Sequence, residues 1–346
     1  METMDFERWR TLLVCPSCRR SLHHAPGAWT CGPCGRSFPI KDGRPIFHDN
    51  PNAVRVMPVE HLSNQLTPEI RAWIRHGPGL TLNIGAGGTI EKLPNCVEFE
   101  YTIFRHTDIV GDAHHLPFAD GAFDAVVTFN TFEHLHTPTL AAGEIYRVLK
   151  PGGRLILQTA FLQPLHEPPH HYYNTTEFGL RRWFRDFDIT ELQVSENFNP
   201  AFVLAWVSSA SVWSVAHELG PEAARELGRT TLDDWRSSWE NEALRAGPGW
   251  DILRRLSQEC QKQFAAGFQL EALKPAASRQ NPPSSLAASL GGVAHRLADR
   301  GSRWRRSLFP EGGVRHRGYQ KGRQAVRIWR QEGFGGLVRR ITRQVI

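Results

Sequence analysis

The sequence predicts a doubly wound α/β fold on a mainly parallel sheet, with a small metal-binding unit before it and a helical region after it. Short apolar runs alternate with helix-like segments from about residue 80 to 190, which is typical of βαβ units. A glycine-rich turn begins at Gly85, directly after the first apolar run. Two close pairs of cysteines precede the alternating region. These three observations define the expected architecture.

The chain of 346 residues is too long for one core of ordinary size, and we expect five parts. They are a cysteine-rich unit at 1–50, an α/β domain at 60–200, a helical region at 201–274, a linker at 275–293 and a basic helical tail at 294–346. The linker is identified by its Ala, Ser, Pro and Gly composition.

Five apolar runs predict the strands of the α/β domain. These are TLNIG, VEFEY, a third strand that ends at Asp112, AFDAVVTF and GRLILQTAF, with the helix PTLAAGEIYRVL before the last. The alternating segment DFDITELQV is expected to supply the last strands of the sheet. Only residues 85–96 connect the first two strands, so the first helix must be very short.

The uncharged run from Ala201 to Ala216 predicts a buried helix. A membrane segment is the alternative, but the run is shorter than the ~20 apolar residues that span a bilayer. The polar N-terminus does not resemble a signal peptide, so we expect a cytoplasmic protein.

Charge is distributed unevenly along the chain, whose formal net charge is +6. Residues 291–346 hold 14 lysines and arginines against three acids, a balance of +11 that leaves −5 for the first 290 residues. Within residues 291–346 apolar residues recur at helical spacing, so this tail is predicted to form a basic amphipathic helix. Its partner is an anionic inner membrane surface, a protein, nucleic acid or the rest of this chain.

Four cysteines predict a structural zinc site. Cys15, Cys18, Cys31 and Cys34 have the spacing C-x2-C-x12-C-x2-C, which places two thiolate pairs on two tight turns. Four cysteine ligands fill a tetrahedral Zn2+, so the site is closed to substrate. Gly32 and Gly35 suit turns whose amide groups point at the sulfur atoms.

Small or polar residues end the predicted strands one after another. The turn Gly85-Ala86-Gly87-Gly88 follows the first strand, Glu100 ends the second, Asp112 the third, and Asn130 follows the fourth. The carboxyl ends of parallel strands meet at the ligand-binding edge of such a sheet. A carboxylate there can accept hydrogen bonds from ribose hydroxyls or from an adenine amino group.

In this order, with LPF at 116–118 and RVLKPGG at 147–153, the residues resemble class I S-adenosylmethionine-dependent methyltransferases. The resemblance implies a seven-stranded Rossmann-like sheet. It places the cofactor against the turn and the strand ends: methionine at Gly85, Ala86 and Gly87, ribose at Glu100, adenine at Asp112 and Ala113, with Asn130 at the floor. The cysteine-rich segment is similar to zinc ribbons that accompany several methyltransferases.

A histidine-rich segment follows the fifth strand. His166-Glu167-Pro168-Pro169-His170 matches the H-E-x-x-H pattern of zinc proteases, but two prolines prevent the helix that this motif needs. We expect a loop over the methyl group, in which His166, His170 or His171 takes a proton from the acceptor. A purely packing role for these histidines is the alternative.

The expected function is methyl transfer to oxygen or nitrogen of a small-molecule, saccharide or lipid-linked glycan acceptor. PLHEPPHHYYNTTEFGL and IWRQEGFGGLVRRI resemble enzymes of bacterial surface-polysaccharide assembly. One alternative is RNA methylation, because some rRNA methyltransferases begin with a four-cysteine ribbon. Another is a non-catalytic binding module in an assembly complex, because the short first crossover could weaken cofactor binding.

Overall fold

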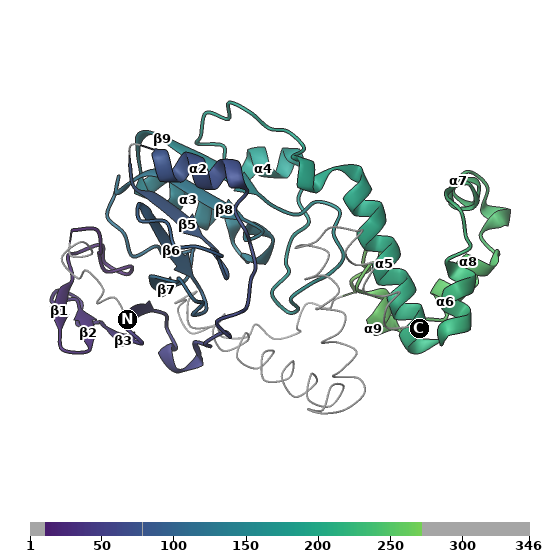
Figure 1. Ribbon diagram of the computed structural model, residues 1–346, viewed down its shortest axis with the longest axis horizontal. Coiled ribbons are helices and arrows are strands. Elements are labelled where there is room, and N and C mark those ends of the chain that lie inside the picture. Colours follow the sequence, from purple (N-terminus) through teal and green to yellow (C-terminus); the bar gives the residue numbers. More distant parts are fainter. Residues whose placement is uncertain (1–10, 78, 272–346) are drawn as a thin grey trace, which may run out of the picture. The chain divides into compact units, whose positions relative to one another are not determined.

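The computed structural model describes residues 11–77 and 79–271 (Figure 1). The predicted linker at 275–293 and basic tail at 294–346 lie outside the described residues. The described chain is organised around one sheet with the strand order β1-β2-β3-β4-β7-β6-β5-β8-β9. Its strands are β1 (His23–Ala25), β2 (Ala28–Thr30), β3 (Ser37–Lys41), β4 (Arg44–Phe47), β5 (Thr81–Ile84), β6 (Cys96–Glu100), β7 (Ile109–Gly111), β8 (Phe123–Phe129) and β9 (Leu149–Gln158).

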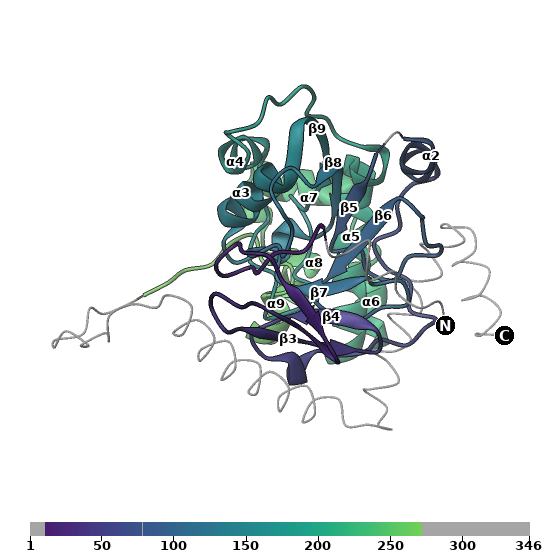
Figure 2. The same ribbon diagram turned by 90° about the vertical axis from the view of Figure 1, so that its left-hand side faces the viewer.

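The central strands are buried on both faces and run parallel. Successive side chains of a strand point to opposite faces, so Val126 and Val127 of β8 pack into two separate clusters. On the Val126 side lie α3 (Pro138–Val148) and α4 (Glu177–Trp183), and on the other side lies α2 (Pro68–His76), as Figure 2 shows. The doubly wound, mainly parallel fold predicted from the sequence is confirmed.

Two details of the predicted sheet are wrong. The segment DFDITELQV, residues 186–194, forms no strand, because Ile189 and Val194 are exposed and no apolar face is buried. A mainly parallel sheet of seven strands was predicted, and the described sheet has nine. Its strands β4 to β9 run parallel, and β4 comes from the cysteine-rich unit at the edge opposite β9. The crossover at 85–95 contains no helix at all, and α2 precedes β5 instead.

The cysteine-rich unit continues directly into the sheet. Its strands β1 to β4 pair antiparallel in sequence order, and β4 then pairs parallel with β7 through Ile46 and Val110. Trp29 of β2 is fully buried in the same core cluster as the central strands. Parallel pairing therefore makes the last strand of this unit the edge strand of the α/β sheet.

The C-terminal part of the described chain is helical. It contains α5 (Pro200–Glu218), α6 (Pro221–Leu227), α7 (Leu232–Glu240), α8 (Pro248–Arg254) and α9 (Gln258–Gln261). Val215 of α5, Leu227 of α6 and Ile252 of α8 share one small core.

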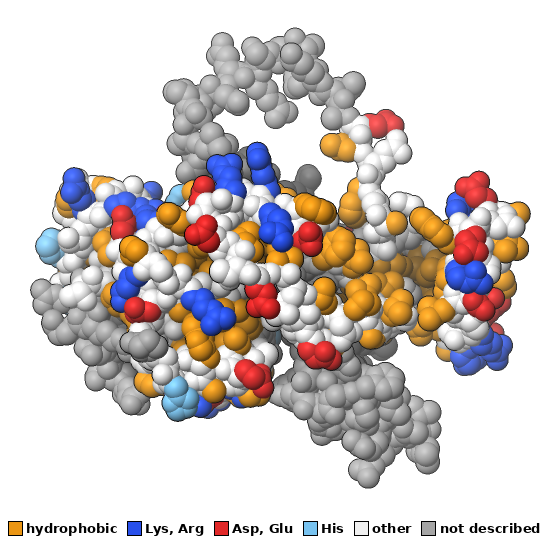
Figure 3. Space-filling view, turned by 90° about the horizontal axis from the view of Figure 1, so that it is seen from above, with side chains coloured by type: hydrophobic (Ala, Val, Ile, Leu, Met, Phe, Trp, Pro, Cys, Tyr) orange, Lys and Arg blue, Asp and Glu red, His pale blue; other side chains and the backbone are white. Residues whose placement is uncertain are grey.

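The helix predicted at 201–216 exists, but the prediction that it is buried is wrong. Only Ser211, Ser214 and Val215 of α5 are buried, whereas Leu204 is 52% exposed and Trp213 40%. Figure 3 shows hydrophobic side chains gathered on the surface of this part of the molecule. Among the described residues no helix has both the length and the apolar character needed to cross a membrane.

Candidate functional site

Four predicted site positions meet at one edge of the sheet. Gly85, Glu100, Asp112 and Asn130 stand at the carboxyl ends of β5, β6, β7 and β8. These four strands are consecutive neighbours in the order β7-β6-β5-β8, and all are parallel. The four residues that follow one another along the sequence therefore lie at the ends of four adjacent strands.

The glycine turn has the backbone conformation that glycine favours. Gly85 and Gly87 have φ of 66° and 64°, and a Cβ on Gly85 would lie 2.0 Å from Oγ1 of Thr131. Ala86 is buried, and the amides of Gly85 and Ala86 both donate to the carbonyl oxygen of Phe99 in β6. A side chain at Gly85 is excluded by both φ and space.

Glu100 is hydrogen-bonded to the same turn. Its Oε2 accepts from the amide of Gly87 at 3.0 Å, and its Oε1 accepts from the amide of Tyr101 at 2.8 Å. Burial raises the pKa of Glu100, and these backbone hydrogen bonds counteract part of that rise. The carboxylate thus links the glycine turn to the end of β6.

Asp112 is held by the residues that follow it. Its Oδ1 accepts from the amide of His114 at 2.9 Å and contacts His114 Nδ1 at 2.5 Å. Burial would raise the pKa of Asp112, but the hydrogen bonds and charge of His114 outweigh it and lower the pKa. Both contacts use Oδ1, and Ala113 beside it is buried. The ring of His114 stacks on that of His136 at 4.0 Å.

The segment before α2 packs on the glycine turn, and sequence reasoning did not assign it to the site. Asn64 Nδ2 donates to the carbonyl oxygen of Gly85 at 2.8 Å, and Ser63 Oγ accepts from the amide of Gly88 at 3.0 Å. Asn64 itself has a φ of 51°. These polar residues replace part of the support that a longer first crossover would give.

The histidine-rich segment forms a loop against the residues that follow β8. The carbonyl oxygen of Glu133 accepts from the amides of Tyr172 at 2.7 Å and Tyr173 at 3.2 Å. The loop carbonyl of His170 meets Nδ1 of His134 at 2.8 Å. The prediction that residues 166–170 are not helical is confirmed.

The three predicted catalytic histidines are not equivalent. The rings of His166 and His171 lie 4.2 Å apart, and His166 is also 5.0 Å from His134. His171 Nδ1 accepts from the amide of His166, and its Nε2 meets Asn174 Oδ1 at 3.2 Å. His170 is exposed, and its ring lies 6.4 Å from that of Tyr172.

Glu133 is the functional candidate that sequence reasoning missed. Its side chain is fully buried, Oε2 accepts from Thr159 Oγ1 at 2.9 Å, and Oε1 has no hydrogen-bond partner. Burial raises the pKa of Glu133 to about 7. The available signal was an acid placed just after the fourth strand, at the same edge as Glu100 and Asp112.

The four cysteines lie together as predicted. Cys15 Sγ is 3.6 Å from Cys34 Sγ, and Cys18 Sγ is 3.4 Å from Cys31 Sγ. These separations suit the corners of a tetrahedron around Zn2+ with bonds of about 2.3 Å. Burial raises the pKa of Cys31 to about 12, so a cation is needed to hold its thiolate.

The two cysteine turns repeat the same hydrogen bonds. In the first turn the amide of Cys15 donates to the carbonyl oxygen of Arg20, and the amide of Arg19 donates to that of Cys15. In the second turn the amide of Cys31 donates to the carbonyl oxygen of Arg36, and the amide of Gly35 donates to that of Cys31. Gly35 has a positive φ as its turn requires, and Arg19 occupies the equivalent place with a φ of 61°. From there the Arg19 guanidinium donates to Glu144 of α3 at 2.6 Å and to the carbonyl of Leu116 at 2.9 Å.

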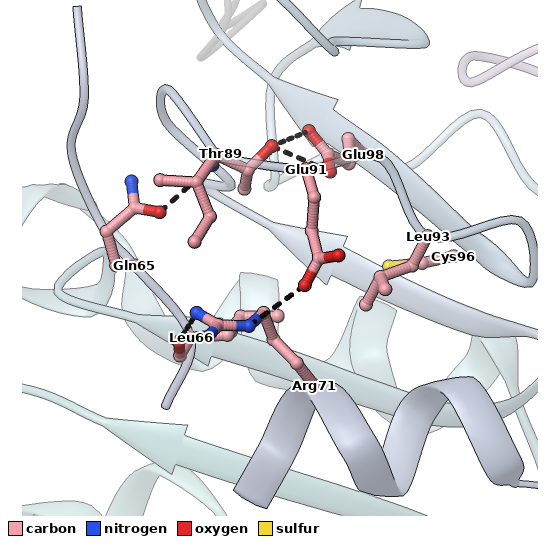
Figure 4. Close-up of a pocket in the computed structure, with 9 residues that line it drawn as sticks. Gln65, Leu66, Arg71, Thr89, Glu91, Leu93, Cys96 and Glu98 are labelled. Atoms are coloured by element: carbon pink, nitrogen blue, oxygen red, sulfur yellow. Dashed lines mark hydrogen bonds and ion pairs between the residues drawn. The ribbon is translucent and has the colours of Figure 1, made fainter. Parts of the chain in front are cut away.

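A small pocket lies apart from the predicted strand-end site, between α2 and the 85–95 crossover (Figure 4). Arg71 of α2 pairs with Glu91 at 3.0 Å on one side of it. On the other side Thr89 Oγ1 donates to the carboxylate of Glu98, whose pKa burial raises to about 8. None of the predicted cofactor or catalytic residues lines this pocket.

Two models of known protein families match segments of this chain. Residues 92–157 match the model of a methyltransferase domain, and residues 11–43 match the model of a Trm112p-like protein. The fold around the first match is Rossmann-like, and residues 92–157 are similar to a methyltransferase domain. The first match includes Glu100, Asp112 and Glu133, and the second includes all four cysteines.

Similar proteins cover only part of the chain. The ubiquinone/menaquinone biosynthesis C-methyltransferase UbiE of Haemophilus ducreyi is 39% identical over 72 residues, which are 21% of this chain and 27% of that protein. A demethylmenaquinone methyltransferase of Streptomyces avermitilis is 31% identical over 127 residues, 37% of this chain and 50% of that protein. The matches thus span at most half the length of these two relatives.

One solved structure among the similar ones is Haemonchus contortus phosphoethanolamine N-methyltransferase 2 in complex with S-adenosyl-L-methionine. It has 17% sequence identity and a TM-score of 0.29. The overlap covers 51% of this chain and 49% of that one.

Proposed function

We propose that this protein transfers a methyl group from S-adenosylmethionine to an oxygen or nitrogen of a small-molecule, saccharide or lipid-linked glycan acceptor. The observation that carries the proposal is the row Asp112, Glu100, Gly85 and Asn130 at the ends of four adjacent parallel strands. Open α/β sheets bind their ligands at this edge.

The residues at this edge fit the cofactor chemically. Glu100 is a carboxylate that can accept from ribose hydroxyls, and Asp112 Oδ2 can accept from an adenine amino group. The turn at Gly85, Ala86 and Gly87 brings the backbone to the methionine part without a bulky side chain. The cofactor supplies a methyl group on a positively charged sulfur, and these residues position it.

On the acceptor side, His166 is the preferred proton acceptor among the three predicted histidines. Its Nδ1 lies 3.0 Å from the carbonyl oxygen of Pro164, so that nitrogen carries the proton in a neutral ring and Nε2 keeps its lone pair. Both nitrogens of His171 already have hydrogen-bond partners. Alignment of the acceptor supplies most of the acceleration, and a base adds to it.

The acceptor class rests on the histidine loop. The relatives above carry names that refer to quinones, and the methyltransferase-domain model that matches this chain ends at residue 157, before the loop begins. The resemblance of the loop segment to methyltransferases of polysaccharide assembly supports a hydroxylated saccharide. Its exposed Tyr172 and Tyr173 suit the faces of sugar rings.

The two alternative functions are less well supported. For RNA methylation, the candidate RNA-binding residues of the ribbon are Trp29, Arg19 and Arg20, but Trp29 is buried and Arg19 pairs with Glu144. The argument for a non-catalytic module is that the short first crossover could weaken cofactor binding. That crossover is supported by Ser63 and Asn64, and the glycine turn keeps its shape.

A transfer assay with radiolabelled S-adenosylmethionine tests the proposal. Zinc-loaded protein is incubated with hydroxylated saccharides, lipid-linked glycans, a reduced quinone and RNA, and labelled product is counted for each. We expect label in the saccharide class, and at least a 100-fold lower kcat for His166→Ala with unchanged cofactor affinity. The exposed His76→Ala serves as the control. Label only in RNA or the quinone would overturn the acceptor class, and full activity of His166→Ala would overturn its role.

A further inference from the structure

Three metal-ligating side chains meet beside the histidine loop. Glu133, His134 and His166 each offer a ligand atom within 4.8 Å of the others. Two of them belong to the short helix η2 (Phe132–His134) after β8, and the third comes from the loop after β9. The chain thus brings together ligands that lie more than 30 positions apart in sequence.

Both imidazoles are held in the tautomer that metal ligation needs. His134 Nδ1 faces the carbonyl oxygen of His170 at 2.8 Å, and His166 Nδ1 faces that of Pro164 at 3.0 Å. A carbonyl oxygen only accepts, so each Nδ1 donates its hydrogen and a neutral ring keeps its lone pair on Nε2. Metal-bound histidines almost always donate their other N–H to such a group.

The carboxylate of Glu133 has an unsatisfied oxygen in a buried place. Oε2 accepts from Thr159 Oγ1, as a metal-ligating carboxylate is commonly hydrogen-bonded, while Oε1 has no partner although the side chain is fully buried. An unsatisfied buried carboxylate oxygen is costly, and a cation beside it removes the cost.

We propose that Glu133, His134 and His166 bind a divalent transition-metal ion, with Zn2+ the best match to two imidazoles and one carboxylate. Ligand atoms that all lie within 4.8 Å of one another are close enough to share one ion with bonds of about 2.1 Å. This site is separate from the four-cysteine site and has different ligands.

Three protein ligands leave at least one coordination position for an atom of another molecule, which distinguishes this site from the closed cysteine site. Such an ion would bind and orient an acceptor oxygen. With the ion bound, His166 is its ligand, and the role of His166 as a base proposed above applies to the protein without this ion. Binding of the ion by these three side chains does not depend on whether the protein transfers methyl groups. Only its use on an acceptor rests on the proposed function.

In a second cluster of metal-ligating side chains, Asp112, His114 and His136, the members already contact one another. There Asp112 Oδ1 already contacts His114 Nδ1, and the ring of His136 stacks on that of His114. These contacts account for the arrangement without an ion.

Cobalt binding to the full-length protein loaded with one equivalent of Zn2+, enough to fill only the four-cysteine site, tests the proposal. Co2+ in a thiolate site gives an intense charge-transfer band in the near ultraviolet, whereas nitrogen and oxygen ligands give only weaker visible bands. We expect one further equivalent of Co2+ with the weaker bands alone, displaced by added Zn2+. Glu133→Gln and His166→Ala should each bind it at least tenfold more weakly, whereas His170→Ala, which keeps the backbone carbonyl, should bind it normally.

Two results would overturn the inference: no Co2+ uptake beyond the thiolate site, or equal uptake by the wild type and both ligand variants. Circular dichroism and the zinc content of the cysteine site show that each variant is folded. Cofactor affinity is measured on the same samples by calorimetry. Failure of the metal site with normal cofactor binding is therefore distinguished from failure of the proposed function.

Discussion

Replacing Glu144 by alanine removes the carboxylate that ties the cysteine-rich unit to the α/β domain. Its Oε1 accepts from Arg19 Nη2 at 2.6 Å, and its Oε2 from Arg147 Nη2 and the amide of Leu116, both at 2.9 Å. The arginines outweigh the effect of burial and lower the pKa of Glu144, so the group is ionised at neutral pH.

The expected cost follows from the burial of each partner. The side chains of Glu144 and Arg147 are 8% and 18% exposed, so Glu144→Ala breaks a nearly buried ion pair and leaves the amide of Leu116 without its acceptor. Arg147 keeps its ion pair with the exposed Asp120 and its hydrogen bonds to the carbonyls of Phe118 and Leu116. A buried charge left without any partner costs about 3–5 kcal/mol; because Arg147 keeps other partners, we expect a loss of about 2–4 kcal/mol in the free energy of unfolding. The Arg19 side chain is 35% exposed, and without it Glu144 keeps Arg147; we therefore expect only about 1–2 kcal/mol for Arg19→Ala.

Urea unfolding of zinc-loaded protein, followed by far-ultraviolet circular dichroism, measures both variants and the double variant. Because the two residues are in contact, the double variant should lose less than the sum of the single losses. A loss of under about 1 kcal/mol for Glu144→Ala, well below the cost of breaking a buried pair, would refute the reasoning.

Three further predictions concern the turn, the ribbon and pH. Gly85→Ala should lower the free energy of unfolding by about 1–3 kcal/mol and weaken cofactor binding, because Gly85 has a positive φ and its Cβ would contact Thr131. Gly143→Ala, in open space on α3, should instead raise the free energy of unfolding by about 0.5–1 kcal/mol. Urea unfolding measures both variants. Cys31→Ser should abolish stoichiometric zinc by metal analysis and lower the melting temperature; zinc retained at the wild-type level would contradict the site. Burial raises the pKa of Glu98 from 4.5 to about 8, so the folded chain keeps a proton that the unfolded chain loses; stability should fall as pH rises from about 5 to 8, and Glu98→Gln should flatten that fall.

Local patterns were sufficient to predict β5 to β9 and the residues at the ends of β5 to β8, although they also predicted a strand at 186–194 that does not form. Apolar runs such as that before Gly85 are buried on both faces, so their composition alone reveals them. Because parallel strands end at one edge, the order Gly85, Glu100, Asp112 and Asn130 also predicted which residues gather there. The cysteine cluster followed from spacing for the same reason, since each pair lies on one turn.

Contacts between distant segments could not be predicted in this way. Arg19 and Glu144 are 125 positions apart, and nothing local to either residue indicates the pair. Asn64 supports the glycine turn, but it belongs to a segment whose sequence indicates only a connecting loop. The apolar composition of α5 predicted burial, yet Leu204 and Trp213 are exposed, because composition does not say whether a helix has a partner to pack against.

Calorimetric titration of zinc-loaded protein with S-adenosylmethionine tests the central claim most directly. We predict saturable binding that is weakened at least tenfold by Glu100→Ala and by Asp112→Ala, with the exposed His76→Ala binding as the wild type does. Absence of binding, or binding that neither carboxylate variant changes, would contradict the assignment of this strand edge as a methyl-donor site.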